Sequence, residues 1–391
     1  MFLTIIIRLI TTLTSSVYNI FIFRKSKPTV YIIDPDQAQI ILKSTDYTRH
    51  KPNHWLIHTL SIVNPFTIPS TSLLNDFKNE VKNTLAHWIN DKHYVNLIGT
   101  VRNCVEYRRA SASQICLSKF VKQVTLDSFL SGILNIRVDE QFLIEIPDLI
   151  IYLWKHRDDQ EAHHRLQTLI SSQSDTFSQS KFWKQIQTIL SNHSNTISTI
   201  ATNEFDEKIH NSLNIIVPGW ETMWRVVFYS LLELLRHREL LDELRIQLNN
   251  PSVSYKNCQL LERIIKEILR LYPPTKNIYR YNEKTNENFC IQVQAIHRNE
   301  KIWGANALEF YPDRFKQKLT DKQKDAYLPF SISCPARHGF AYAFAGAIIA
   351  EILKQYPNLI VSNNSSTVLT DTLLDMSRDS YKELLVEIHS Q

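Results

Sequence analysis

Glycine is scarce in this sequence, which contains six glycines in 391 residues. Average usage in proteins is about 7%. Few positions can therefore adopt a positive φ angle at low cost, so helix is favoured through most of the chain.

The chain also lacks the cysteine pattern of a disulfide-stabilised secreted protein. Its five cysteines form no Cys-x-x-Cys pair and are too few to staple a chain of this length. We therefore expect reduced thiols, on the cytosolic side of any membrane. The cysteines are Cys104, Cys116, Cys258, Cys290 and Cys334.

Long runs of a single charge sign are missing as well. The net charge is only +5, and the basic residues are spread along the chain without interleaved aromatic residues. This distribution disfavours nucleic-acid binding. The hydrophobic and charged fractions, 43% and 21%, are those of a globular protein, and the length suffices for one large domain or two ordinary ones.

Residues 1–23 form the most apolar segment at either end of the chain, although Arg8 and several Ser and Thr residues interrupt it. A transmembrane helix needs roughly 20 mostly apolar residues. Arg24, Lys25 and Lys27 follow at once and fit a cytosolic flank. We predict a membrane anchor or interfacial helix here, with an amphipathic or core helix as the alternative.

Residues 24–391 are predicted to form one mainly helical domain with small β-sheets. Residues 28–33 favour a strand, and the turn that follows caps a helix. Residues 50–75 are rich in Pro, Asn, Ser and Thr and predict a loop. No linker or internal repeat divides the remaining, mostly helical sequence.

The longest helical pattern covers residues 214–248 and contains Pro218-Gly219, where we expect a kink. Glu221 and Thr222 follow directly. An acid beside an alcohol at an opened helical turn can hold water and relay protons into a pocket. The alternative is a solvated acid and a hydroxyl that bonds back to its own helix.

Residues 260–272 predict a strongly amphipathic helix that is stopped by two prolines. Glu267 and Arg270 lie on one face of it, three positions apart. Arg314 can join them in a network beneath a cofactor pocket. The alternative is an ordinary surface ion pair of small energetic value.

Cys334 directly precedes an apolar helical pattern that continues to Leu353, and Pro335 suits the first helical position. A thiol in front of a helix faces free N–H groups that favour the thiolate, the form that binds metals and haem iron. The alternative is a small buried hydrophobic residue.

Taken together and in this order, these motifs resemble the cytochrome P450 family. The PGWET segment at 218–222 resembles the kinked helix over the haem, and Glu267 to Arg270 resembles the family's E-x-x-R motif. FYPDRF at 310–315 resembles the segment that supplies the arginine partner, here Arg314. The segment from Phe330 to Arg337 resembles the haem-ligand segment, and YIIDPDQAQIILKS resembles the N-terminal strand and helix.

The resemblance implies a P450 fold, truncated in places, and a monooxygenase that inserts one oxygen atom from O2 into a lipophilic substrate. It implies haem b as cofactor, NADPH–cytochrome P450 reductase as electron source, and the endoplasmic reticulum membrane as location, with a cytosolic catalytic domain. The implied site comprises Cys334 as iron ligand, Glu221 and Thr222 for proton delivery, Arg280, Arg337, Phe330 and Gly219 at the cofactor, with His338 as a further candidate, Trp220 and Met223 near the pocket, and Glu267, Arg270 and Arg314 as structural residues.

The sequence also departs from the family pattern. Only three residues separate Phe330 from Cys334, no Trp-x-x-x-Arg motif is present, and the strand region 282–291 is clipped. The alternative is therefore a degenerate P450-fold protein with weak or no haem binding. A haem-thiolate enzyme that rearranges an oxygenated substrate without a reductase is a third possibility, which the Glu221-Thr222 pair disfavours.

Overall fold

The computed structural model describes most of the chain. The described ranges are 29–108, 113–198, 208–337, 339–370 and 372–388. The predicted anchor at residues 1–23 lies outside them. Within the described residues, no helix combines the length and the apolar character that crossing a bilayer requires.

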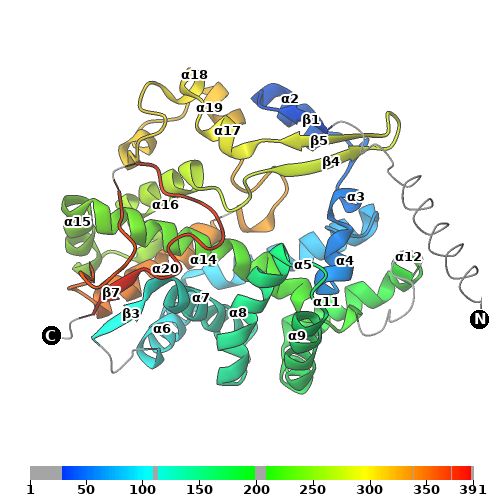
Figure 1. The fold of residues 1–391 in the computed structure, drawn as a ribbon, viewed down its shortest axis with the longest axis horizontal. Helices are drawn as coiled ribbons and strands as arrows, with labels where there is room; N and C mark the ends of the chain where they lie inside the picture. The colour runs from blue at the N-terminus through cyan, green and yellow to red at the C-terminus, as the bar shows by residue number, and fades with distance from the viewer. Residues whose placement is uncertain (1–28, 109–112, 199–207, 338, 371, 389–391) are drawn as a thin grey trace, which may run out of the picture.

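Helices make up most of the fold, as the sequence predicted (Figure 1). The α-helices of the first half are α2 (Pro35–Lys43), α3 (His50–Asn53), α4 (Trp55–Leu60), α5 (Thr71–Ile89), α6 (Asp91–Tyr107), α7 (Leu117–Ser128), α8 (Glu140–Lys155), α9 (Gln160–Ser172), α10 (Ser174–Phe177), α11 (Lys181–Asn192) and α12 (Ser194–Ser198). Those of the second half are α14 (Leu213–Arg236), α15 (Arg238–Asn249), α16 (Gln259–Leu271), α17 (Val293–His297), α18 (Glu300–Trp303), α19 (Asp321–Ala326) and α20 (Phe340–Gln355).

Short segments of tighter or wider helix and two small sheets complete the fold. The π-helix is η1 (Phe129–Ile133), and the 3-10 helices are η2 (Tyr255–Asn257), η3 (Pro312–Phe315) and η4 (Pro335–Arg337). The strands are β1 (Thr29–Ile32), β2 (Tyr47–Thr48), β3 (Gln114–Cys116), β4 (Ile278–Asn282), β5 (Glu287–Ile291), β6 (Ile360–Val361) and β7 (Leu385–Glu387).

The larger sheet has the strand order β1-β5-β4-β2 and lies at one end of the molecule (Figure 1). Its first strand and the following helix are the ones that the sequence predicted at residues 28–43. The side chain of Asp34 caps α2 by accepting a hydrogen bond from the Gln37 N–H at 2.9 Å. A second sheet, β3-β7-β6, joins the middle of the chain to its C-terminal segment.

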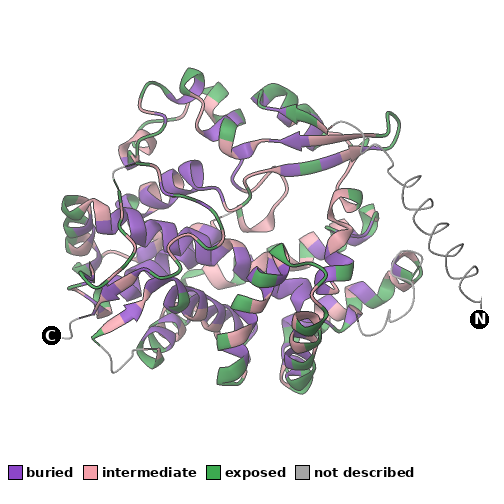
Figure 2. Ribbon diagram, viewed as in Figure 1, coloured by how far each residue is buried: buried purple, intermediate pink, exposed green. Residues whose placement is uncertain are grey.

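Helix α14 lies at the centre of the main core, and nearly all of its residues are buried (Figure 2). It packs against α7, α16 and α20, so segments far apart in the sequence meet on its surface. The predicted helical stretch 214–248 is in fact two helices, α14 and α15. His237 separates them because its backbone leaves the helical region and its N–H bonds back to the Glu233 carbonyl.

A smaller hydrophobic cluster lies between the larger sheet and the helices α2, α17, α18 and α19. The expectation of a single domain from residue 24 onward stays a prediction. The predicted loop at residues 50–75 is wrong in part, because α3, α4 and the start of α5 lie within it. Leu56, Ile57 and Leu60 are buried in the main core, and this packing overrides the loop-like composition.

Candidate cofactor site

The predicted network of Glu267, Arg270 and Arg314 is present and buried. Arg270 donates two hydrogen bonds to the Glu267 carboxylate, at 2.8 and 2.7 Å, and Arg314 Nε donates to Glu267 Oε1 at 3.5 Å. The remaining donors of both arginines reach backbone carbonyls, including those of His297 and Ala307 at 2.7 Å, and Arg314 also donates to Asn306 Oδ1 at 2.9 Å. The network therefore fastens the chain after β5 to helix α16.

His297 extends this network to the segment that carries Cys334. Its Nε2 atom accepts a hydrogen bond from the Leu328 N–H at 2.8 Å, and Nδ1 lies 3.1 Å from the Arg270 carbonyl, to which it donates. Burial, followed by the charge of Arg270, lowers the pKa of His297 to about 3, so the ring is neutral. Sequence reasoning missed His297, because a histidine six residues after the end of the clipped strand region 282–291 carries no signal by itself.

Glu221 and Thr222 lie on α14 in different surroundings. Glu221 is buried, and its two carboxylate oxygens accept hydrogen bonds from Arg225 at 3.1 and 3.2 Å. Arg378, from the segment before β7, donates to the same carboxylate. Thr222 is partly exposed, and among the described residues its hydroxyl makes no protein hydrogen bond.

The two arginines determine the charge of Glu221. Burial raises the pKa of its carboxyl, but the charges and hydrogen bonds of Arg225 and Arg378 outweigh burial, and the pKa is lowered overall. Glu221 is therefore an ionised acceptor in this structure. Its predicted role in proton delivery requires one arginine to release the carboxylate.

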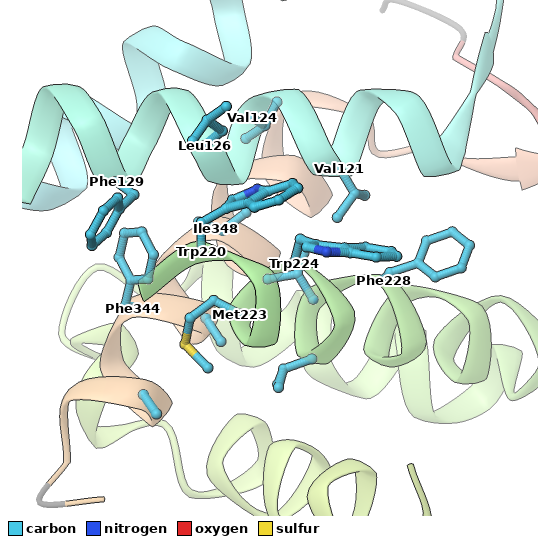
Figure 3. Close-up of a cluster of buried hydrophobic side chains, with 14 of the residues drawn as sticks. Val121, Val124, Leu126, Phe129, Trp220, Met223, Trp224, Phe228, Phe344 and Ile348 are labelled. Atoms are coloured by element: carbon cyan, nitrogen blue, oxygen red, sulfur yellow. The ribbon is translucent and has the colours of Figure 1, made fainter. Parts of the chain in front are cut away.

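The other α14 residues that were expected at the pocket pack into the core. Trp220 is fully buried, points toward α7 and donates from Nε1 to the Lys122 carbonyl at 3.0 Å, whereas Met223 is buried on the other side of α14 (Figure 3). Gly219 lies against Phe129: a Cβ atom at this position would come within 2.4 Å of the Phe129 ring. Gly219 thus leaves space for the Phe129 ring of η1. The expected contact of Gly219 with a cofactor is replaced by this packing contact.

Cys334 precedes a short turn rather than the long helix. Pro335–Arg337 form η4, and α20 starts only at Phe340, after Gly339 with φ +100°. The expectation of a cysteine directly in front of the long apolar helix is therefore corrected. Gly339 tolerates the left-handed conformation that separates the two helices.

The Cys334 sulfur has a mixed environment. Burial raises the pKa of its thiol, and the pKa stays raised overall, because hydrogen bonds from the backbone N–H groups of Ala336 and Arg337 and the charges of Arg337 and Lys78 offset burial only in part. Lys78 lies on α5, which packs against η4. The turn thus supplies part of the support that a thiolate needs, although burial keeps the thiol protonated in this structure.

Phe330 and Arg337, which were expected at the cofactor, instead make contacts that hold the loop around Cys334. Phe330 packs edge-on against Tyr342 of α20, with ring centroids 5.8 Å apart. Arg337 is exposed and donates to the Ile332 carbonyl, which braces the loop against itself. His338 lies outside the described residues.

Arg280 is buried on β4. Arg49 lies near it, and the sequence analysis did not identify Arg49 as a candidate site residue. The Nη1 atom of Arg280 donates to the Tyr279 carbonyl at 2.9 Å. Burial, with a contribution from the charge of Arg49, lowers the pKa of Arg280 to about 9. Burial also lowers the pKa of Arg49. Among the described residues no carboxylate pairs with either side chain.

Comparisons with known proteins agree with this architecture. The sequence profile of the family described as Cytochrome P450 matches residues 122–356. A cytochrome P450-like protein of Acanthamoeba polyphaga mimivirus is 26% identical over 204 residues, which are 48% of this chain and 42% of that protein. A putative cytochrome P450 of Caenorhabditis elegans is 30% identical over 175 residues, covering 39% of this chain and 33% of that protein.

The chain belongs to the cytochrome P450 family. Among solved structures, the haem domain of a cytochrome P450DA mutant has a TM-score of 0.66 and 17% identity, and the match covers 92% of this chain and 86% of that one. This likeness shows that the fold is shared. The alignments to the two curated relatives span less than half of either relative's length.

The residues of this P450 fit haem in two respects. The family's haem iron takes a cysteine thiolate, and Cys334 offers a thiol that two backbone N–H groups and two cations support. Haem also carries two propionate carboxylates, and Arg49 and Arg280 are cations without a carboxylate partner among the described residues. Two pockets of about 50 and 290 Å³ lie elsewhere, beside α15 and beside α2.

Proposed function

We propose that this protein is a haem-thiolate monooxygenase that inserts one oxygen atom from O2 into a lipophilic organic substrate. The observation that carries the proposal is the supported thiol of Cys334 on a P450 fold. The family resemblance adds the finer parts: haem b, NADPH–cytochrome P450 reductase as partner, and attachment to the endoplasmic reticulum membrane through residues 1–23.

The chain's own residues would divide the work as follows. Cys334 would hold the iron, and Arg280 would bind a propionate. Bound haem supplies the chemistry of O2 activation. The hydroxyl of Thr222 would orient water at α14. Once Arg378 withdraws, Glu221 would accept a proton from bulk water at Oε1 and pass it to the oriented water. Glu267, Arg270 and Arg314 would act only by fixing the fold, because the two arginines donate to the Glu267 carboxylate and to backbone carbonyls.

The test is the absorption spectrum of the reduced full-length protein with and without CO. We expect a strongly red-shifted Soret band from the wild type and its loss in Cys334→Ser. Cys116→Ser is the matched control, because Cys116 is also a partly exposed free thiol and should leave the band unchanged. A Cys334→Ser protein that keeps the red-shifted band would overturn the proposal.

The separation of Cys334 from α20 favours a second candidate: a P450-fold protein without thiolate-ligated haem. The sulfur receives two N–H groups of a three-residue turn instead of the first turn of a sixteen-residue helix, whose dipole is larger. This candidate predicts a folded, helical protein that shows no red-shifted band after expression with ample haem. Circular dichroism on the same sample separates it from simple misfolding.

A further inference from the structure

The pocket of about 290 Å³ lies where the start of α2 meets α18 and α19, at the same end of the molecule as the larger sheet (Figure 1). Pockets that enclose a whole drug-sized ligand measure roughly 300–1,000 Å³. This pocket therefore suits a small polar group whose apolar part stays outside. The polar side chains that line it come from three segments of the chain and are Asp34, Asn299, Lys301 and Lys322.

The two lysines of this pocket have no acid partner. Among the described residues, neither the Lys301 nor the Lys322 ammonium group lies within ion-pair distance of a carboxylate. By contrast, Lys324, two positions further along α19, pairs with Asp321 at 2.6 Å. Asn299 uses its Oδ1 atom on the Lys301 N–H at 2.9 Å, which leaves its Nδ2 atom as a further donor. Donors of this kind suit an anionic group with several oxygens, such as a phosphate.

Asp34 adds a negative charge to the same pocket. Its Oδ1 atom caps α2 through the Gln37 N–H at 2.9 Å, and its Oδ2 atom makes no hydrogen bond within the described part of the chain. This carboxylate repels a free phosphate but attracts an ammonium group that is attached to the phosphate. The charges therefore fit a zwitterion that carries both groups.

The surface beside the pocket is apolar, which favours a lipid over a soluble zwitterion. Ile33 lines the pocket and is 55% exposed, and Tyr31 on the edge strand β1 and Ile40 on α2 are 64% and 66% exposed. Exposed apolar residues that gather on one surface mark contacts with membranes or other proteins. Only residues 24–28 separate β1 from the anchor predicted at 1–23, and a chain of that length spans at most roughly 20 Å. We therefore expect this edge of the molecule at the membrane.

We propose that the pocket binds the headgroup of phosphatidylethanolamine. Lys301 and Lys322 bind its phosphate, and the Asp34 carboxylate accepts hydrogen bonds from its ammonium group. The acyl chains pass Ile33 and enter the bilayer. A choline headgroup fits less well, because its quaternary nitrogen has no hydrogen to donate to Asp34. The site shares with the proposed function only the expected membrane at residues 1–23, and it requires neither haem nor a reductase.

The first experiment measures thermal unfolding of the full-length protein with glycerophosphoethanolamine, the soluble form of the headgroup. This compound should raise the unfolding temperature of wild type but not that of Lys322→Gln, which lacks one of the two cations. Lys324→Gln is the matched control, because it removes the same charge from the same helix at a lysine that already has a partner. It should respond as wild type does. An equal response of wild type and Lys322→Gln would overturn the site.

The second experiment tests the ammonium end of the ligand with Asp34→Asn. Asparagine caps a helix about as well as aspartate does, so α2 should stay capped while the charge is lost. By calorimetric titration, this variant should bind glycerophosphoethanolamine about fivefold more weakly, and inorganic phosphate no more weakly, than wild type. Unchanged binding of glycerophosphoethanolamine would show that Asp34 reads no ammonium group and would overturn the zwitterion site. A wild type that binds inorganic phosphate equally tightly would do the same.

The third experiment separates a lipid from a free zwitterion. Vesicle flotation compares bilayers of phosphatidylcholine alone with bilayers that also contain phosphatidylethanolamine. Wild type and Lys324→Gln should bind the second kind more tightly, whereas Asp34→Asn should bind both kinds equally. A wild type without this preference would overturn the lipid as ligand. Tighter binding to anionic phosphatidylglycerol vesicles that Lys322→Gln and Lys324→Gln weaken alike would show general charge attraction and overturn the site.

Failure of this proposal is distinguishable from failure of the proposed function. All three measurements work on the full-length protein with or without haem. A wild type without a red-shifted Soret band would overturn the monooxygenase and leave the headgroup site standing. A wild type with that band but without the headgroup responses would do the reverse.

Discussion

Two groups of buried arginines in this molecule are built in opposite ways. Arg270 and Arg314 share the Glu267 carboxylate and use their remaining donors on backbone carbonyls. Arg49 and Arg280 lie near enough for the charge of Arg49 to lower the pKa of Arg280, and neither forms an ion pair with a carboxylate among the described residues. The charges of the first group are balanced within the protein, whereas no described acid balances the two cations of the second group.

The Glu221 cluster on α14 lies between these extremes. Its single carboxylate is shared by Arg225, from the same helix, and Arg378, from a segment that is distant in sequence. One cation is fixed by helical geometry, and the other depends on the docking of the C-terminal segment. A movement of the C-terminal segment would therefore remove Arg378 from Glu221 and leave the carboxylate with Arg225 alone.

The sharpest test of the comparison is to remove one arginine from each group. Arg270→Met leaves Glu267 buried with a weakened partner, so we expect a loss of about 3–5 kcal/mol in the free energy of unfolding. Arg49→Met removes a like-charge contact, so the haem-free protein should become slightly more stable, by less than about 1 kcal/mol. Urea unfolding of both haem-free variants measures whether each substitution lowers or raises the free energy of unfolding. Equal destabilisation would show that the two groups are energetically alike.

The next effect is a dependence of stability on pH that arises from His297. The folded pKa is about 3 and the model-peptide value is 6.5, so the unfolded state binds a proton first as the pH falls. Stability from this group is therefore complete above about pH 6.5 and is lost progressively toward pH 3.

His297→Gln tests this dependence. The amide can still donate and accept a hydrogen bond but does not titrate, so the slope of stability between pH 6.5 and 4 should become shallower. His163→Gln is the control, because His163 is more exposed and shows no buried bridge. Unfolding free energies measured at several pH values decide, and an unchanged slope in His297→Gln would contradict the neutral bridging role.

A smaller effect is expected from Arg378→Met. Glu221 keeps Arg225, so the loss of one charged hydrogen bond should cost about 1.5–3 kcal/mol. The pKa of Glu221 should rise, because one of the two cations that lower it is gone. Infrared difference spectra of the carboxylate during acid titration can follow this change. An Arg378→Met protein in which Glu221 titrates as in wild type would show that Arg225 alone determines its charge.

Much of the candidate site was predictable because its signals are local. The apolar repeat of residues 260–272 determines which face of α16 is buried, and that face carries Glu267 and Arg270 with it. The tie of Arg314 to this pair was a hypothesis from the charges alone, and the family resemblance supported it. The start of α20 was misplaced because apolar spacing continues through Gly339, whose left-handed backbone ends the repeat without changing the composition.

Other parts depend on contacts between distant segments. Arg378 reaches Glu221 across 157 positions, and His297 reaches Leu328 across 31. No local pattern marks either residue, because each is an ordinary polar side chain within its own segment. The need for glycine at position 219 is also set by a distant segment, because the ring that excludes a Cβ atom there belongs to Phe129 of η1.

The sequence by itself determined the family, the helical class and the order of the motifs, because these follow from the residue types and their spacing along the chain. Tertiary structure alone decided which charges are satisfied. It paired Glu267 and Glu221 with arginines, and it brought Arg49 near Arg280 without an acid partner among the described residues. The physical reason is that a charge is stabilised by whatever lies within a few ångströms of it in space, and strand register and helix docking set those neighbours.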